Sequence, residues 1–151
     1  MTALAEWRAR PSYYRRNGTP IWYGTSDKAH HRALMEWTRM LEGDRKVNDT
    51  TLPNGIRVST VWLGLDHNFG FDGPPLIFES MAFSASVNVH KAREGSVFVR
   101  DFAYHEELDC ERYSTEAEAA VGHVMMCLRW YPDVMHMLPE VAHGFKEAPK
   151  A

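Results

Sequence analysis

Apolar residues recur with helical spacing near the start of the chain. Leu34, Trp37 and Leu41 repeat at i, i+3 and i+7, which is the pattern of a helix that buries one face. Asp27 precedes this stripe as an expected N-cap, and Gly43 follows it at the position expected just past the last turn. The pattern therefore predicts an amphipathic helix between these two residues.

A second helical pattern lies toward the other end of the chain. Thr115 and Glu118 have the spacing of a capping box, and Pro132 is expected to end the helix. The apolar face expected to contact the core comprises Ala117, Ala120, Val121, Val124, Cys127, Leu128 and Tyr131.

Strand-like patterns fill the interval between the two helices. Residues 45–52 and 56–65 flank the turn signal PNG and predict a hairpin. Residues 61–63 are apolar on both faces, which predicts a central strand covered on two sides. Further strands are expected over 76–84, 96–103 and 108–113. The expected fold class is α+β: an antiparallel meander sheet of four to five strands with two main helices, forming a two-layer sandwich.

Composition is that of an ordinary globular domain. The 151 residues are 44% hydrophobic and 25% charged, which suits one domain with one core. No apolar stretch approaches the roughly 20 residues that cross a bilayer, and the first ten residues lack a signal-peptide pattern. Cys110 and Cys127 are expected to be free thiols in a reducing cytoplasm. We expect an arm over residues 1–25, a single domain over 26–131, and a partly docked tail over 132–151.

Charge is distributed unevenly. Residues 1–25 hold four arginines, Arg15 and Arg16 among them, and one acid, whereas residues 101–120 hold seven acids and one arginine. Arginines interleaved with aromatic residues are typical of proteins that bind single-stranded nucleic acid. The pI near 6.2 is low for that class. The pattern favours docking of the arm onto the acidic stretch, within one chain or between two.

Adjacent Asp66 and His67 are the strongest candidates for chemistry, because they follow a strand and precede a glycine-rich loop. With Glu79 and His123 they are candidates for acid–base catalysis, and His67, Glu79 and His123 for a divalent metal. Their spacing matches no established metal motif. The favoured alternative is structural: Asp66 caps the loop, His67 bonds to backbone, and Glu79 meets an arginine.

Other enzyme signatures are not found in the sequence. It has no G-x-S-x-G elbow and no phosphate-binding glycine pattern. The pair His30–His31 is expected to be solvated, and the acidic stretch 104–111 is expected to form a solvated or partner-facing edge. No cofactor is expected.

Methionine and aromatic residues near the second helix are candidates for an adaptable contact surface. An alternative is that the same residues hold the chain's own tail. The residues are Met125, Met126, Trp130, Tyr131, Met135 and Met137.

Three ordered motifs, VSTVWLGLDH, GPPLIFESMAF and RYSTEAEAAVGH, give the chain a resemblance to a family. It resembles small proteins of unassigned function encoded by phages of actinobacteria, the mycobacteriophages among them. The resemblance covers roughly residues 56–123 and differs from the common pattern at Ser80 and at Ala120–Val121. It implies a viral protein in the host cytoplasm and supplies no catalytic residues.

These observations give one leading hypothesis and two alternatives. The leading hypothesis is a phage accessory protein that acts by binding a host bacterial protein, modulates the host without catalysis, and forms a homodimer. The alternatives are an enzyme that uses Asp66, His67, Glu79 and His123, and a nucleic-acid binder that uses the arm. No membrane association is expected.

Overall fold

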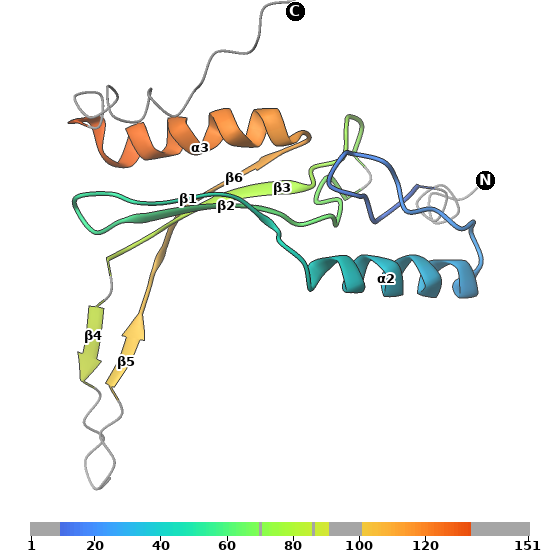
Figure 1. The fold of residues 1–151 in the computed structure, drawn as a ribbon, viewed down its shortest axis with the longest axis horizontal. Helices are drawn as coiled ribbons and strands as arrows, with labels where there is room; N and C mark the ends of the chain where they lie inside the picture. Colours follow the sequence, from blue (N-terminus) through green and yellow to red (C-terminus); the bar gives the residue numbers. More distant parts are fainter. Residues whose placement is uncertain (1–9, 70, 86, 91–100, 134–151) are drawn as a thin grey trace, which may run out of the picture.

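The computed structural model describes residues 10–69, 71–85, 87–90 and 101–133. Strands β1, β2, β3 and β6 form one antiparallel sheet in that order, and β4 pairs with β5 in a separate hairpin between β3 and β6 (Figure 1). The predicted α+β class is confirmed. The elements are α2 (Asp27–Leu41), β1 (Lys46–Thr51), β2 (Arg57–Trp62), β3 (Phe78–Phe83), β4 (Val87–His90), β5 (Asp101–Tyr104), β6 (Glu107–Tyr113) and α3 (Glu116–Trp130).

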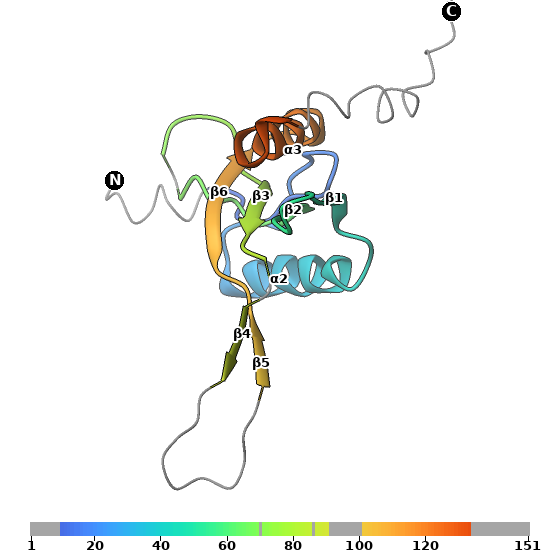
Figure 2. The same cartoon turned by 90° about the vertical axis from the view of Figure 1, so that its left-hand side faces the viewer.

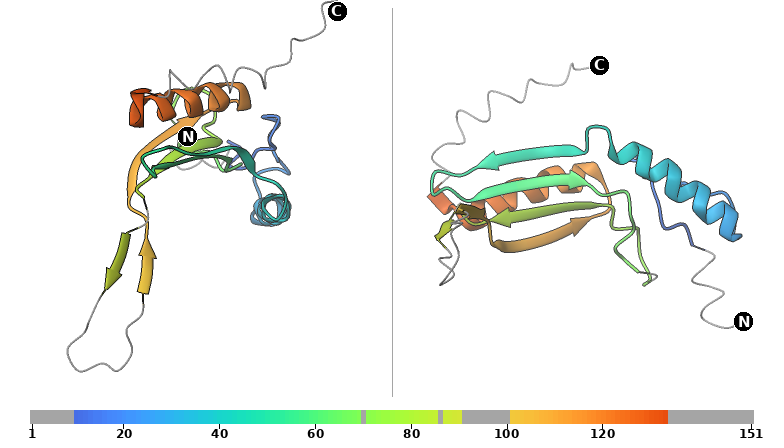
Figure 3. Two further views of the ribbon diagram at one scale, coloured as in Figure 1. Left: turned by 60° about the vertical axis from the view of Figure 1, so that its left-hand side comes forward. Right: turned by 90° about the horizontal axis from the view of Figure 1, so that it is seen from below.

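The two helices occupy different positions relative to the sheet. Helix α3 lies across one face, whereas α2 extends beyond the end of the strands (Figures 1 and 3). The β4–β5 hairpin projects away from the sheet on the side opposite α3 (Figure 2). Among the described residues, no helix combines the length and apolar composition needed to cross a bilayer.

Small side chains at the centre of the sheet let α3 approach closely. Thr60 pairs with Ser80, and Val58 pairs with Ala82, and all four side chains are fully buried. Gly122 of α3 meets the ring of Tyr113, and a Cβ at that position would overlap it. The close approach therefore depends on glycine at this point of the helix.

The predicted inward face of α3 is wrong. Ala117, Ala120, Val121 and Val124 are exposed, and Leu128 and Tyr131 are only half-buried. Only Cys127 of the predicted set is buried. The error has a physical cause. The inward face carries a glycine that meets an aromatic ring and a histidine that hydrogen-bonds to the sheet, so it is not the most apolar face of the helix. The residues that face the core are Ala119, Gly122, His123, Met126 and Cys127.

Three further expectations are corrected. Ser26, not Asp27, caps α2: its side chain accepts a hydrogen bond from the N–H of Ala29. The expected strand over 96–103 is described only from residue 101, in β5, which pairs with β4 and adds no strand to the main sheet. Strand β2 is fully buried on one face only, because Ser59 and Val61 are half-buried.

The arm packs onto the domain over its described residues. Backbone hydrogen bonds join Tyr14 to Gly64 and Asp66 to Ser12, so the arm lies antiparallel to the segment after β2. Tyr13, Tyr14 and Ile21 are buried. The predicted capping box of α3 is also present, and both cysteines are free as expected. The expected docked tail, with Met135 and Met137, lies outside the described residues.

Candidate functional site

Asp66 and His67 have structural partners. One carboxylate oxygen of Asp66, Oδ1, accepts hydrogen bonds from the N–H groups of Asn68 and Leu76, at 2.8 and 3.0 Å. The Nδ1–H of His67 donates to the carbonyl of Leu65 at 2.9 Å. Asp66 therefore closes the loop that follows β2, as the structural alternative predicts.

Glu79 and His123 belong to opposite faces of the sheet. The Glu79 side chain accepts a hydrogen bond from Arg112 Nε at 2.8 Å on the face away from α3. His123 projects from α3 into the other face, where Thr60 is 2.8 Å from Nδ1 and Thr50 is 2.9 Å from Nε2. Each side chain therefore has its own partners.

His123 is the centre of a buried hydroxyl network. Thr60 also contacts the hydroxyl of Ser80 at 2.6 Å, and these three side chains are buried. Burial lowers the pKa of His123, although the charge on Asp49 opposes this change. A neutral imidazole between hydroxyl groups satisfies polar atoms in the core and has no open face for a substrate.

The four candidates of the enzyme hypothesis are therefore not brought together. Asp66 and His67 lie in a loop beyond the end of β2, and Glu79 and His123 are separated by the sheet. Within the described ranges, no three His, Cys, Asp or Glu side chains form a group that could hold a metal ion.

Two of the three described arginines of the arm are paired with carboxylates of the same chain. Arg15 contacts Glu36 at 2.5 Å, and Arg16 binds both carboxylate oxygens of Glu116 at 2.6 and 2.8 Å. The Arg16–Glu116 pair joins the arm to the acidic stretch, as the charge pattern favours. It also lowers the pKa of Glu116. These two arginines are consequently engaged by carboxylates.

The loop after β2 is braced from two sides. Asn68 donates its side-chain amide to the carbonyls of Phe71 and Pro74, and Arg10 donates to the carbonyls of Phe71 and Gly73. Phe69 has a positive φ of 48°, which non-glycine residues rarely adopt. Its side chain is 65% exposed, and that of Phe71 is 73% exposed. The bracing thus holds two phenylalanines toward solvent.

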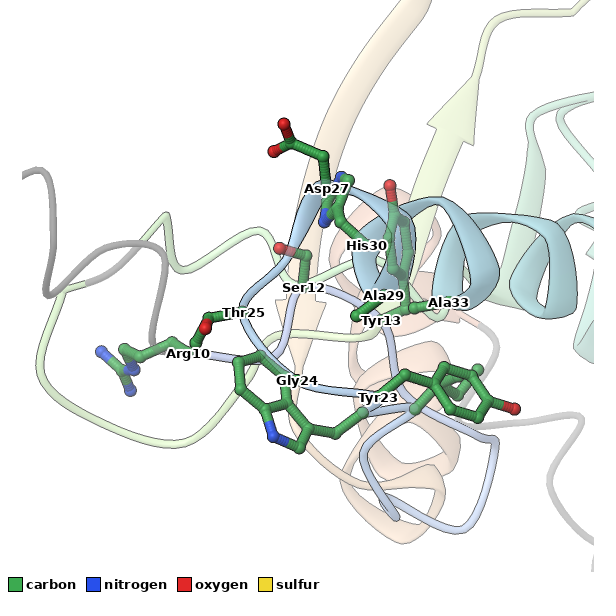
Figure 4. A pocket seen from close by; sticks show the side chains of 12 residues that line it. Arg10, Ser12, Tyr13, Tyr23, Gly24, Thr25, Asp27, Ala29, His30 and Ala33 are labelled. Atoms are coloured by element: carbon green, nitrogen blue, oxygen red, sulfur yellow. The ribbon is translucent and has the colours of Figure 1, made fainter.

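Two hollows lie beside this loop and share their central wall. The first, of about 230 Å³, lies between the arm and the start of α2 (Figure 4). The second, of about 240 Å³, lies between the arm and the loop. The shared wall comprises Arg10, Ser12, Tyr13 and His30. We call the two hollows together the arm–loop groove.

Aromatic side chains border the arm–loop groove. Trp22 and Tyr23 line the first hollow, and Phe69 lines the second. Figure 4 shows Tyr13 beside His30 in the first hollow, and their ring centroids are 5.6 Å apart. The sequence patterns do not predict this site: the aromatic-rich arm and the Phe69–Gly70 pair after Asp66 are the only signals near it, and neither indicates that the two segments meet.

The arm–loop groove contains charges of both signs. Arg10 stands at the shared wall, whereas Asp27 lines the first hollow and Asp66 lines the second. Each hollow therefore has an acidic residue in its lining, which disfavours a polyanion. The combination of aromatic walls, hydroxyl groups and opposite charges suits a ligand with amide donors and acceptors and apolar side chains.

The residues predicted to form a contact surface near α3 differ in their exposure to solvent. Met125 is 55% exposed, but Met126 is completely buried against the sheet and cannot contact a partner. Trp130 and Tyr131 are half-buried and pack on the core, and Trp130 also donates to Asp109. Of these four residues only Met125 presents most of its side chain to solvent.

Comparisons of the chain with protein-family models, curated proteins and solved structures find no match.

Proposed function

We propose that this chain is a binding protein that recognises an extended peptide segment of a partner protein in the arm–loop groove. The observation that carries this proposal is Phe69, which is exposed and held in a left-handed backbone conformation by a loop braced through Asp66, Asn68 and Arg10. Strained, exposed residues fixed by their surroundings are typical of recognition sites.

A peptide fits the groove better than a nucleic acid does. Two neighbouring hollows of similar volume suit two side chains of one extended segment, because alternate side chains of a strand project to the same side. The carboxylates of Asp27 and Asp66 disfavour phosphate groups. The resemblance to phage proteins supports a host protein in the bacterial cytoplasm as the source of the peptide.

The test is selection of a displayed random-peptide library on the full chain, followed by affinity measurements on the selected peptides. Phe69→Ala and Trp22→Ala are expected to weaken binding by at least about tenfold, as loss of an aromatic anchor does. Met35→Ala is the control, because Met35 is exposed on α2 outside the groove. Selected peptides that bind the groove variants as tightly as the wild type would contradict the proposal.

Phe69→Gly separates binding from stability. Glycine adopts positive φ without strain, so this change is expected to leave the free energy of unfolding unchanged or to raise it by up to about 1 kcal/mol. Peptide affinity should fall as it does for Phe69→Ala. Binding of a labelled single-stranded oligonucleotide tests the nucleic-acid alternative. Binding that weakens steeply with salt would favour that alternative.

A further inference from the structure

The solvent-facing side of α3 is apolar along most of its length. Between Glu118 and Arg129, every exposed residue of α3 is apolar, and Val121 is 65% exposed. A helix that packs on a sheet ordinarily presents polar residues to water. We call this surface the outer face of α3; it comprises Ala117, Ala120, Val121, Val124, Met125 and the half-buried Leu128.

The outer face lies on the outside of the described part of the chain. Helix α3 is the outermost described layer on its side of the sheet, whereas α2 and the β4–β5 hairpin project to the other side (Figures 1 and 2). None of the described helices and strands lies over the outer face. A second helix could therefore lie along it.

We propose that a second copy of this chain covers the outer face, with the two α3 helices packed antiparallel around a twofold axis. The distribution of side-chain size supports this partner. The small residues Ala117 and Ala120 lie in the first half of the helix, and the large residues Met125 and Leu128 lie in the second half. Antiparallel packing sets small side chains against large ones, as dense packing requires.

The facing pairs follow if the twofold axis passes the midpoint of the outer face, between Gly122 and His123. Ala117 faces Leu128 of the second copy, Ala120 faces Met125, and Val121 faces Val124. A parallel arrangement would instead set alanine against alanine and leave voids at one end.

The helix dipole supports the same arrangement. The charged side chains Glu116 and Arg129 at the two ends of α3 have partners in their own chain, Arg16 and Asp109 respectively. Antiparallel packing brings the N-terminus of each helix to the C-terminus of the other and so aligns the two helix dipoles favourably. The interface is self-complementary, as a twofold dimer requires. This inference is independent of the arm–loop groove.

The association is expected to be moderate. Helix α3 has 15 residues and is about 22 Å long at 1.5 Å per residue. One helix face is smaller than the roughly 800 Å² per partner of a standard interface, so a dissociation constant of about micromolar order is expected.

Sedimentation equilibrium of the full chain over a concentration series tests the proposal. The wild type should dimerise, and Val121→Glu alone or Val124→Lys alone should raise the dissociation constant by at least about 30-fold, because each buries an unpaired charge. Met35→Glu, which alters an exposed apolar residue of α2, should leave the dimer intact. Circular dichroism and thermal unfolding show whether each variant is folded.

Mixing the two variants tests the antiparallel register. In an equimolar mixture, the introduced carboxylate faces the introduced ammonium of the other variant, so the mixture should regain the dimer. A wild type that stays monomeric up to about 100 μM overturns the proposal, since that excludes micromolar affinity. If folded single variants still dimerise, the outer face of α3 is not the dimer interface. If the mixture stays monomeric, the antiparallel register is wrong.

Discussion

Helices α2 and α3 have the same length but differ in which residues they bury and which they expose. Each has 15 residues and a capped N-terminus. Helix α2 buries Ala29 and Ala33 and presents charged residues to water, whereas α3 buries a histidine and presents Val121 and Met125. The difference shows that apolar periodicity alone does not identify the face of a helix that packs on the chain's own core.

The inward face of α3 is specified by shape and hydrogen bonds. Gly122 accommodates the Tyr113 ring, and His123 bonds to Thr50 and Thr60. The inward face of α2 is specified by apolar packing of Ala33 with Tyr13 and Ile21, and by a bond from Trp37 Nε1 to the carbonyl of Leu63. The comparison can be tested by changing each face in turn.

The largest effect is expected at Gly122. Gly122→Ala adds a methyl group that overlaps the Tyr113 ring, and overpacking of this kind costs about 2–3 kcal/mol of stability. Urea unfolding of the variant in dilute solution measures the loss. Val121→Ile adds one methyl group on the outer face and should change stability by less than about 0.5 kcal/mol. Equal effects at both positions would contradict the assignment of the two faces.

The next effect concerns pH and His123. Its pKa is lowered from 6.5 by burial, so the unfolded chain binds a proton before the folded chain does. Stability should therefore be complete above about pH 6.5 and fall as pH decreases toward the folded pKa, by at most about 1.4 kcal/mol per pH unit for one proton.

His123→Gln should remove this dependence, measured as unfolding free energy at several pH values. The carboxyl groups of Glu36, Asp109 and Glu116 have pKa values lowered from 4.5, 3.8 and 4.5 by ion pairs or hydrogen bonds. Their contribution is lost only at more acidic pH. An unchanged slope between pH 5 and 6.5 in the variant, a range set by the ordinary histidine pKa of about 6.5, would contradict the role of His123.

The caps of the two helices should differ in strength. Thr115 and Glu118 form a reciprocal capping box, whereas Ser26 satisfies one N–H group. Thr115→Ala is therefore expected to cost about 1–2 kcal/mol and Ser26→Ala about 0.5–1 kcal/mol. Chemical unfolding of both variants measures the two losses of stability. A larger loss for Ser26→Ala than for Thr115→Ala would contradict the prediction.

The smallest effect is expected for the pair that joins the arm to α3. Arg16 and Glu116 are both partly exposed, so Arg16→Ala should cost at most about 1 kcal/mol and less at high salt. Unfolding at low and high ionic strength measures this. Lys28→Ala, on the exposed side of α2, is the matched control. A salt-independent loss would show that Arg16 acts through packing.

Local signals predicted the elements and the structural roles of Asp66 and His67, but not the arm–loop groove. The capping box at Thr115 and the turn at 53–55 depend on neighbouring residues, and both are present. The favoured structural interpretation of Asp66 as the cap of its loop is confirmed, because its partners are backbone N–H groups of that loop. The arm–loop groove joins residues more than 50 positions apart, such as Arg10 and Phe69, so no local pattern describes it.

The sequence by itself determined the fold class and the presence of helices α2 and α3, because these follow from periodicity, turn residues and caps. Charge favoured a contact between the arm and the acidic stretch, which Arg16 makes with Glu116, whereas Arg15 pairs with Glu36 of α2. Only the tertiary structure decided which face of α3 is inward, and that Phe69 and Trp22 border one groove. A glycine against a tyrosine ring and a histidine between two threonine hydroxyls are contacts between distant segments. Their energy depends on shape and hydrogen bonding in three dimensions, which hydrophobicity along the chain does not record.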